Sequence, residues 1–101
     1  MKSKENGSKH DKLILDVGAV QNSTELHCLL QKNLGLPDFY GMNWDAFWDA
    51  ITGLIELPET LIFEGWNNVE GKLPKDSHIL INLLDDFNEQ YPHWKCKVVY
   101  K

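Results

Sequence analysis

The chain has 101 residues, and 43% of them are hydrophobic, which is enough for one domain with a single small core. Its 15 acidic residues outnumber its 10 basic ones, for a formal net charge of −5, and this balance argues against a protein that binds the phosphate backbone of nucleic acids. Without a membrane-length apolar run, a signal peptide or a disulfide framework, the sequence predicts a cytoplasmic protein with no membrane partner.

The first half of the chain is predicted to contain a tail, a strand and a helix. Residues 1–11 lack Leu, Ile and Val and are expected to be a disordered basic tail, so that the domain occupies residues 12–101. The aliphatic run at 12–17 predicts a buried strand. Ser23 or Thr24 is expected to cap a helix over residues 25–34, which Gly35 ends. A loop at 36–41 follows.

The second half is predicted to alternate helices and strands. Asn43 is a good cap for a helix that runs to Gly53, and residues 60–64 form a second strand. Residues 65–75 are loop-like, with room for a short helix near 67–69. A last helix, capped by Asp76 or Ser77, extends from 78 to about 90, and residues 95–100 form the closing strand. Right-handed crossovers then favour an α/β fold, with a small three-stranded parallel sheet packed against three to four helices.

The helix after Asn43 separates its side chains into distinct faces at 100° per residue. The predicted core face holds Phe47, Ala50, Ile51 and Leu54; the opposite face holds Asp45, Asp49 and Thr52; and Trp44 and Trp48 lie between the two. Residues 33–71 contain seven acids but no lysine or histidine, so no cation nearby in the sequence neutralises this helix. A large aromatic surface is thus predicted directly beside two carboxylates.

Those two carboxylates are unfavourable for the helix that carries them. Asp45 and Asp49 repel each other at a spacing of four residues, and Asp49 lies toward the C-terminal half, where the helix dipole disfavours a negative charge. A solvated acidic face beside half-buried tryptophans is the plain structural interpretation. A binding role for the pair is the alternative, because its position does not benefit the helix itself.

The pattern is not typical of a catalytic or metal site. Two acids on the outside of one helix form a convex surface, whereas paired catalytic carboxylates need a cleft. The histidines at 27, 78 and 93 are scattered, so we expect neither a metal nor another cofactor, and no enzyme. Tryptophans beside carboxylates instead suit a surface that binds a basic protein, such as a cationic cleft built to hold phosphates.

Several other residues are expected to have structural roles only. Cys28 and Cys96 are predicted to be small buried side chains in a reducing compartment. His27 is predicted to lie on the helix surface or at the boundary of the core, and Trp66 and Trp94 are predicted to be packing residues.

The helix and its flanks resemble a known family. The resemblance rests on the string Tyr40-Gly41-x-Asn43-Trp44-Asp45-Ala46-Phe47-Trp48-Asp49 followed by Thr52-Gly53, and on Thr24-x-Leu26-His27 with Leu34-x-Leu36-Pro37 upstream. Both are similar to the barstar family of intracellular ribonuclease inhibitors, over about residues 12–101. The resemblance implies the same three-stranded parallel fold. It also implies tight binding to a basic, secreted barnase-type ribonuclease or a related toxin nuclease, whose active site the protein would plug. We expect the protein to be a monomer.

The resemblance also implies which residues touch the partner. Asp49 would enter the phosphate pocket, and Asp45 would pair with further cations at its rim. The full implied set is Phe39, Tyr40, Gly41 and Asn43 in the loop, Trp44, Asp45, Trp48, Asp49, Thr52 and Gly53 on the helix, Glu56 after it, and Asp86 on the last helix, with Asp85 as a possible substitute. Two alternatives stay open: a binding or immunity module of the same fold for another basic partner, and a hydrolase that uses the acidic helix.

Overall fold

The computed structural model describes residues 12–101, so the predicted tail at 1–11 lies outside the described part of the chain. The elements in chain order are β1 (Lys12–Asp16), α1 (Ser23–Leu34), α2 (Trp44–Gly53), β2 (Thr60–Glu64), α3 (Trp66–Lys72), α4 (Pro74–Gln90), the 3₁₀ helix η2 (Pro92–Trp94) and β3 (Lys97–Tyr100). The predicted α/β class is confirmed.

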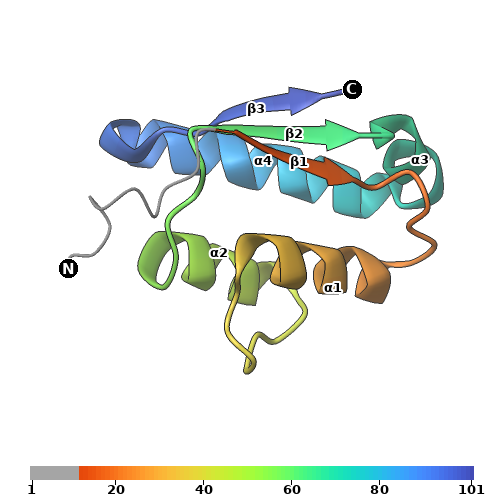
Figure 1. Cartoon of the computed structure of the whole chain (residues 1–101), viewed down its shortest axis with the longest axis horizontal. Coiled ribbons are helices and arrows are strands. Elements are labelled where there is room, and N and C mark those ends of the chain that lie inside the picture. The colour runs from red at the N-terminus through yellow and green to blue at the C-terminus, as the bar shows by residue number, and fades with distance from the viewer. Residues whose placement is uncertain (1–11) are drawn as a thin grey trace.

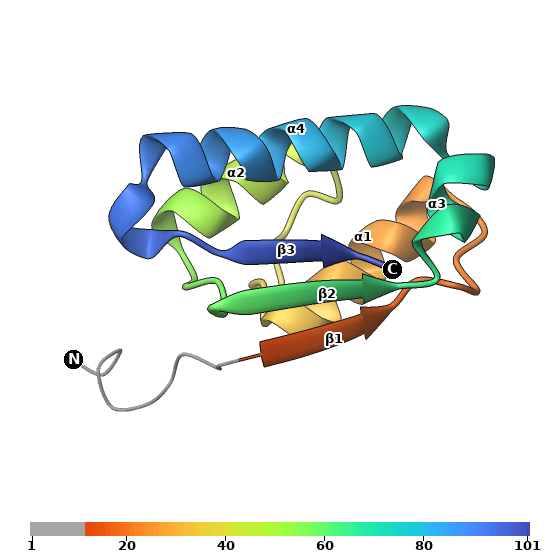
Figure 2. The ribbon, with the colours of Figure 1, turned by 90° about the horizontal axis from the view of Figure 1, so that it is seen from above.

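The three strands form one parallel sheet in the order β1-β2-β3, with Leu15 opposite Phe63 and Phe63 opposite Tyr100. Each crossover moves the chain one position in the same direction across the sheet. Because both crossovers have the same handedness, the helices between the strands lie on the same face of the sheet. Figures 1 and 2 show α1, α2 and α4 in a layer on that face, with α3 at the end where the strands finish.

The core lies between the sheet and this helix layer. Alternate residues of β1 and β2 point into it, as the strand period of two requires, while Ile14 on the open face of the sheet stays 48% exposed. The largest fully buried side chains are Leu15, Leu61 and Phe63 from the sheet, Leu26 and Leu30 from α1, Phe47 and Ile51 from α2, Leu57 from the loop after it, and Leu80, Leu84 and Phe87 from α4. Every layer therefore contributes to a single core.

Most predicted element boundaries are confirmed, and the exceptions have local causes. β2 and α2 occupy the predicted residues. The predicted cap of α1 is wrong, because Asn22 takes that position and its side chain accepts a hydrogen bond from the Glu25 backbone at 2.9 Å. β3 begins at Lys97, two residues later than predicted.

The short helix predicted near 67–69 is present as α3, but the loop predicted around it is wrong, because α3 extends over Trp66–Lys72 and α4 follows from Pro74. Gly65, with a φ of 75°, is the residue before α3 and places the chain in the left-handed region that glycine tolerates. α4 begins at Pro74, so Asp76 and Ser77 lie in its first turn and do not cap it. Proline suits a first helical turn because its missing N–H has no partner there in any case.

Candidate protein-binding surface

The acidic helix α2 is fixed by its N-terminal cap and by its buried face. The Asn43 side chain accepts a hydrogen bond from the Ala46 backbone at 2.7 Å and donates one to the Gly41 carbonyl at 3.1 Å, which joins the loop to the helix. Phe47, Ala50 and Ile51 are buried, as predicted. These contacts hold α2 against the core, so its outer face is presented on a rigid support.

The predicted core position of Leu54 is wrong, since its side chain is 55% exposed. α2 ends at Gly53, and Leu54 is its C-cap, with a backbone N–H that still donates to the Ala50 carbonyl at 2.9 Å. Its φ of −118° departs from the ordinary helical value near about −60°, so the spacing that places Phe47, Ala50 and Ile51 on one face holds only approximately at Leu54. The result is an exposed aliphatic side chain at the C-terminal end of α2.

Asp45 and Asp49 lie on the outer face of α2, and both are exposed. Within residues 12–101 neither carboxylate forms an ion pair, and the last turn of α2 contains no basic residue. Their mutual repulsion and the unfavourable helix dipole at Asp49 are thus left uncompensated by the described part of the chain. A partner that brings cations to this face would relieve both effects.

The two tryptophans of α2 face α4. The Trp44 indole N–H donates a 2.8 Å hydrogen bond to a carboxylate oxygen of Asp76. Trp48 is half-buried, and its ring centroid lies 6.5 Å from those of both Phe87 and Tyr91. Trp44 and Trp48 therefore anchor the acidic helix to α4, and their uncovered parts lie next to the aspartates.

The loop before α2 is supported from inside by a buried polar contact. A 2.6 Å hydrogen bond joins His27 Nδ1 to the Tyr40 hydroxyl, and the His27 ring lies 4.3 Å from the Trp44 ring, centroid to centroid. The predicted surface or boundary position of His27 is wrong, because the side chain is only 1% exposed. Burial lowers the pKa of His27 and outweighs the opposing influence of Asp76. Burial likewise raises the pKa of Tyr40 above its usual range, so the hydroxyl stays protonated.

The rest of this loop is open to solvent. Phe39 is 78% exposed, and Gly41 is exposed beside it. Tyr40 is buried, so the structure places it beneath the loop. Met42 has a φ of 57°, a left-handed conformation that costs a non-glycine residue roughly 1–2 kcal/mol. The turn into α2 is thus held in one strained shape by its surroundings.

Three further predicted residues lie in the last turn of α2 or shortly after it. Thr52 is half-buried, and its hydroxyl donates a 2.7 Å hydrogen bond to the Trp48 carbonyl, while Gly53 is exposed at the end of the helix. Glu56 is half-buried, and one of its carboxylate oxygens is buried without a hydrogen-bond partner among residues 12–101. Gly53 and Thr52 extend the surface of Asp45 and Asp49, whereas Glu56 is partly withdrawn from it.

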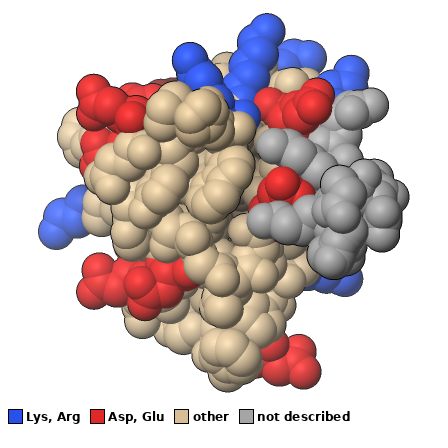
Figure 3. All heavy atoms as spheres, turned by 90° about the vertical axis from the view of Figure 1, so that its left-hand side faces the viewer, with Lys and Arg blue, Asp and Glu red and all other residues tan. Residues whose placement is uncertain are grey.

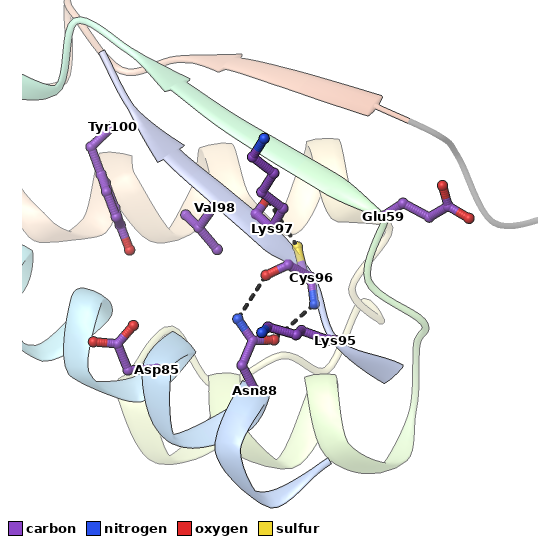
Figure 4. A pocket seen from close by; sticks show the side chains of 8 residues that line it. All are labelled: Glu59, Asp85, Asn88, Lys95, Cys96, Lys97, Val98 and Tyr100. Atoms are coloured by element: carbon purple, nitrogen blue, oxygen red, sulfur yellow. Dashed lines mark hydrogen bonds between the residues drawn. The ribbon is translucent and has the colours of Figure 1, made fainter. Parts of the chain in front are cut away.

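The neighbouring acids Asp85 and Asp86 face different sides of α4. Asp85 lines an open groove between α4 and β3, where it lies near Tyr100 and contributes, after burial, to a raised pKa of that tyrosine (Figure 4). Asp86 is exposed, and it lies on the side of α4 that carries Leu83 and Asp76. Asp86 is three residues after Leu83, and Leu83 is seven residues after Asp76, and both spacings return to about the same side of a helix. Since Asp76 contacts Trp44 of α2, Asp86 is the acid on the α2 side.

The groove beside β3 is separate from the predicted surface. It is lined by Glu59, Asp85, Asn88, Lys95, Cys96, Lys97, Val98 and Tyr100, of which only Asp85, the possible substitute for Asp86, belongs to the predicted set. Asn88 closes one side of it by two hydrogen bonds to the Cys96 backbone, at 2.7 and 2.8 Å (Figure 4). These two hydrogen bonds give Asn88 a structural role, because they join α4 to the segment before β3.

The other structural predictions have mixed outcomes. Cys96 is buried, as predicted, but the predicted burial of Cys28 is wrong, because it lies on the exposed side of α1. Trp66 is 4% exposed and packs against Phe63 and Tyr100, which confirms its packing role. Trp94 stacks on Tyr91 yet keeps 45% of its surface exposed.

Sequence reasoning missed the supporting role of Asp76 and His27. Helical periodicity places residues on faces of one helix, but it cannot show that Asp76 and His27, 49 positions apart, both meet Trp44. One signal was available: an aspartate in the first turn of a helix and a histidine inside an apolar stripe both call for polar partners.

Two kinds of feature are missing from the part of the chain that the structure describes. Across residues 12–101 no cluster of His, Cys, Asp and Glu side chains is arranged to hold a metal ion. In the same range, none of the helices combines the length and the apolar character needed to cross a membrane.

Two comparisons relate the chain to known proteins. It is 42% identical over 55 residues to a Bacillus subtilis (strain 168) protein named "Putative ribonuclease inhibitor YrdF". That alignment covers 54% of this chain and 60% of the relative. The sequence model of the family described as Barstar (barnase inhibitor) matches residues 10–101. With nearly its whole length covered by that match, the chain belongs to the Barstar (barnase inhibitor) family.

Proposed function

We propose that the protein inhibits a basic, barnase-type ribonuclease by covering its active site with the outer face of α2 and the loop before it. The observation that carries this proposal is the pair of exposed carboxylates, Asp45 and Asp49, which no cation within residues 12–101 neutralises. A ribonuclease active site holds cations for the phosphates of RNA. Carboxylates on a rigid helix can occupy the same positions and so compete with RNA.

In this arrangement each part of the surface has a distinct task. Asp49 enters the phosphate-binding pocket, and Asp45 pairs with cations at its rim. Phe39 and Gly41 contact the enzyme from the loop, while Trp48 and Thr52 pack around the aspartates and exclude water from the ion pairs. Asp86 adds a charge from α4. Tyr40 and Asn43 act by holding the loop and the first turn of α2 in place.

The central test replaces the two aspartates in turn. Asp49→Ala should weaken inhibition of barnase by about 100-fold or more, because removing one member of a buried ion pair costs roughly 3 kcal/mol or more. Asp45→Ala should have a smaller effect in the same direction. Inhibition is measured as the inhibitor concentration that halves RNA cleavage, and circular dichroism checks that the fold is retained.

Asp85 and Asp86 provide a matched control for charge alone. Both variants, Asp85→Ala and Asp86→Ala, remove one exposed acid from adjacent positions of α4. Only Asp86→Ala should weaken inhibition, since Asp85 faces β3. Unchanged inhibition by Asp49→Ala and Asp45→Ala together would contradict the proposal, and so would a failure of the unaltered chain to inhibit barnase.

The proposed function also predicts the location of the protein, its oligomeric state and its need for cofactors. A cell that makes a secreted ribonuclease needs an inhibitor for the enzyme that has not yet left, so we place the protein in the cytoplasm and expect it to act as a monomer. It needs no cofactor and catalyses no reaction, because it acts by occupying the active site of its partner.

A further inference from the structure

Three aromatic rings form a series from the middle of α2 to the 3₁₀ helix that follows α4. The centroid of Trp48 in α2 lies 6.5 Å from that of Tyr91, which directly follows α4. Tyr91 in turn stacks on Trp94 of η2, with centroids 5.6 Å apart and ring planes 11° apart. Because Trp48 adjoins Asp49, this series extends the acidic surface of α2 as far as η2.

The outer end of the series is open to solvent. Trp94 is 45% exposed, and Leu54 at the end of α2 is 55% exposed. Figure 3 looks onto the side of the molecule where α2 and α4 end, and there uncharged side chains cover a broad area, with acidic groups at separate places around it and basic groups mainly along its upper edge. Exposed aromatic and aliphatic side chains inside a charged border are typical of a protein–protein contact.

We propose that Tyr91 and Trp94 form a second contact with the ribonuclease, against an apolar patch beside its cationic active site. This inference rests on the proposed function, because its occupant is the enzyme that Asp49 holds. The occupant follows from continuity: Trp48, at the inner end of the series, adjoins Asp49, and a specific interface covers about 800 Å² on each partner and so extends beyond one helix face. Trp94 and Tyr91 are the nearest exposed or half-exposed rings along the series from Trp48.

The second contact differs in chemistry from the first. Carboxylates on α2 attract any enzyme with a cationic phosphate-binding site, whereas a flat, stacked indole favours enzymes whose surface fits it. Tryptophan and tyrosine are also the side chains that most often dominate binding energy when a partner covers them. Tyr91 and Trp94 would therefore select among basic ribonucleases that Asp45 and Asp49 alone do not distinguish.

The test measures binding of barnase to the Trp94→Ala variant. We expect the affinity to fall about tenfold, mainly through faster dissociation, since the lost contact acts after the encounter. Trp94→Phe should keep most of the affinity because a ring remains. His93→Ala, an exposed neighbour in η2, is the matched control and should stay within about twofold of the unaltered chain.

A second measurement uses the unaltered chain and does not depend on how well a variant folds. In nuclear magnetic resonance spectra, the indole N–H signal of Trp94 should shift or broaden when barnase is added. The signal of Trp66 serves as the internal control, because Trp66 is buried and is the first residue of α3, the helix at the end where the strands finish (Figure 1). It should not change.

The outcomes separate this inference from the proposed function. If Trp94→Ala stays within twofold while Asp49→Ala weakens binding, the second contact is overturned and the proposed function stands. An unchanged Trp94 indole signal in the complex overturns the second contact in the same way. If neither Asp49→Ala nor Asp45→Ala has an effect, the proposed function fails, and the second contact fails with it.

Discussion

The buried histidine beneath the loop makes the stability of the fold depend on pH. His27 is 1% exposed and shares a 2.6 Å hydrogen bond with Tyr40, the residue that anchors the loop from inside. Its pKa is lowered by burial, so the folded protein favours the neutral ring. In the unfolded chain the same ring titrates near the ordinary value of 6.5. As the pH falls below about 6.5, the unfolded chain therefore takes up a proton that the folded protein resists.

We predict that the free energy of unfolding decreases between pH 7.5 and pH 5.5. The sign follows from linkage, because the unfolded state binds more protons than the folded state in this range. His27→Gln, which keeps a polar side chain but does not titrate there, should flatten the dependence. Urea unfolding at a series of pH values measures it. His78→Gln removes an exposed histidine of α4 and should leave the slope unchanged; an equal slope in His27→Gln would contradict the assignment.

At the scale of single elements, the cap of α2 has a stronger effect on binding than the cap of α1. Asn22 and Asn43 cap their helices in the same way. Each has an extended backbone, and each side chain accepts a hydrogen bond from the backbone N–H three residues further along the chain. Each Asn→Ala variant should lose about 1 kcal/mol of stability. Only Asn43→Ala should also weaken inhibition of barnase, several-fold, because Asn43 also bonds to Gly41 and orders the turn before Asp45.

The two asparagine variants control for each other. Thermal unfolding reports the stability loss that they should share, and the inhibition assay reports the effect that should separate them. Equal inhibition by Asn22→Ala and Asn43→Ala would show that the cap of α2 contributes to the fold alone.

The elements that were predicted correctly are those whose ends are marked in the sequence itself. Asn43 begins α2, and the run at 60–64 after Pro58 delimits β2, so both have the predicted bounds. The start of α4 was missed because it depends on Pro74 as a first helical residue. The exposure of Asp45 and Asp49 was predictable, since one helix face decides it. The burial of Tyr40 and His27 was not, because three separate segments create it.

Over the whole molecule, the acidic charge is distributed unevenly in a way that should guide association. Residues 13–101 hold 13 acids against six lysines, a net charge of −7, and residues 33–71, which include all of α2, contain no lysine. Attraction between this surface and a basic enzyme acts across water, and salt screens it over about 10 Å at 0.1 M ionic strength. We predict that the association rate with barnase falls several-fold between 50 and 500 mM NaCl, while the dissociation rate changes less.

Two double variants with the same change of net charge test whether location matters. Asp45→Asn with Asp49→Asn removes two charges from the outer face of α2, and Glu70→Gln with Asp85→Asn removes two exposed charges from α3 and from the β3 side of α4. Stopped-flow association rates at several salt concentrations should show a much weaker salt dependence for the first pair only. If both pairs lose salt dependence equally, net charge alone guides the encounter, and the acids of α2 contribute only after the partners have met.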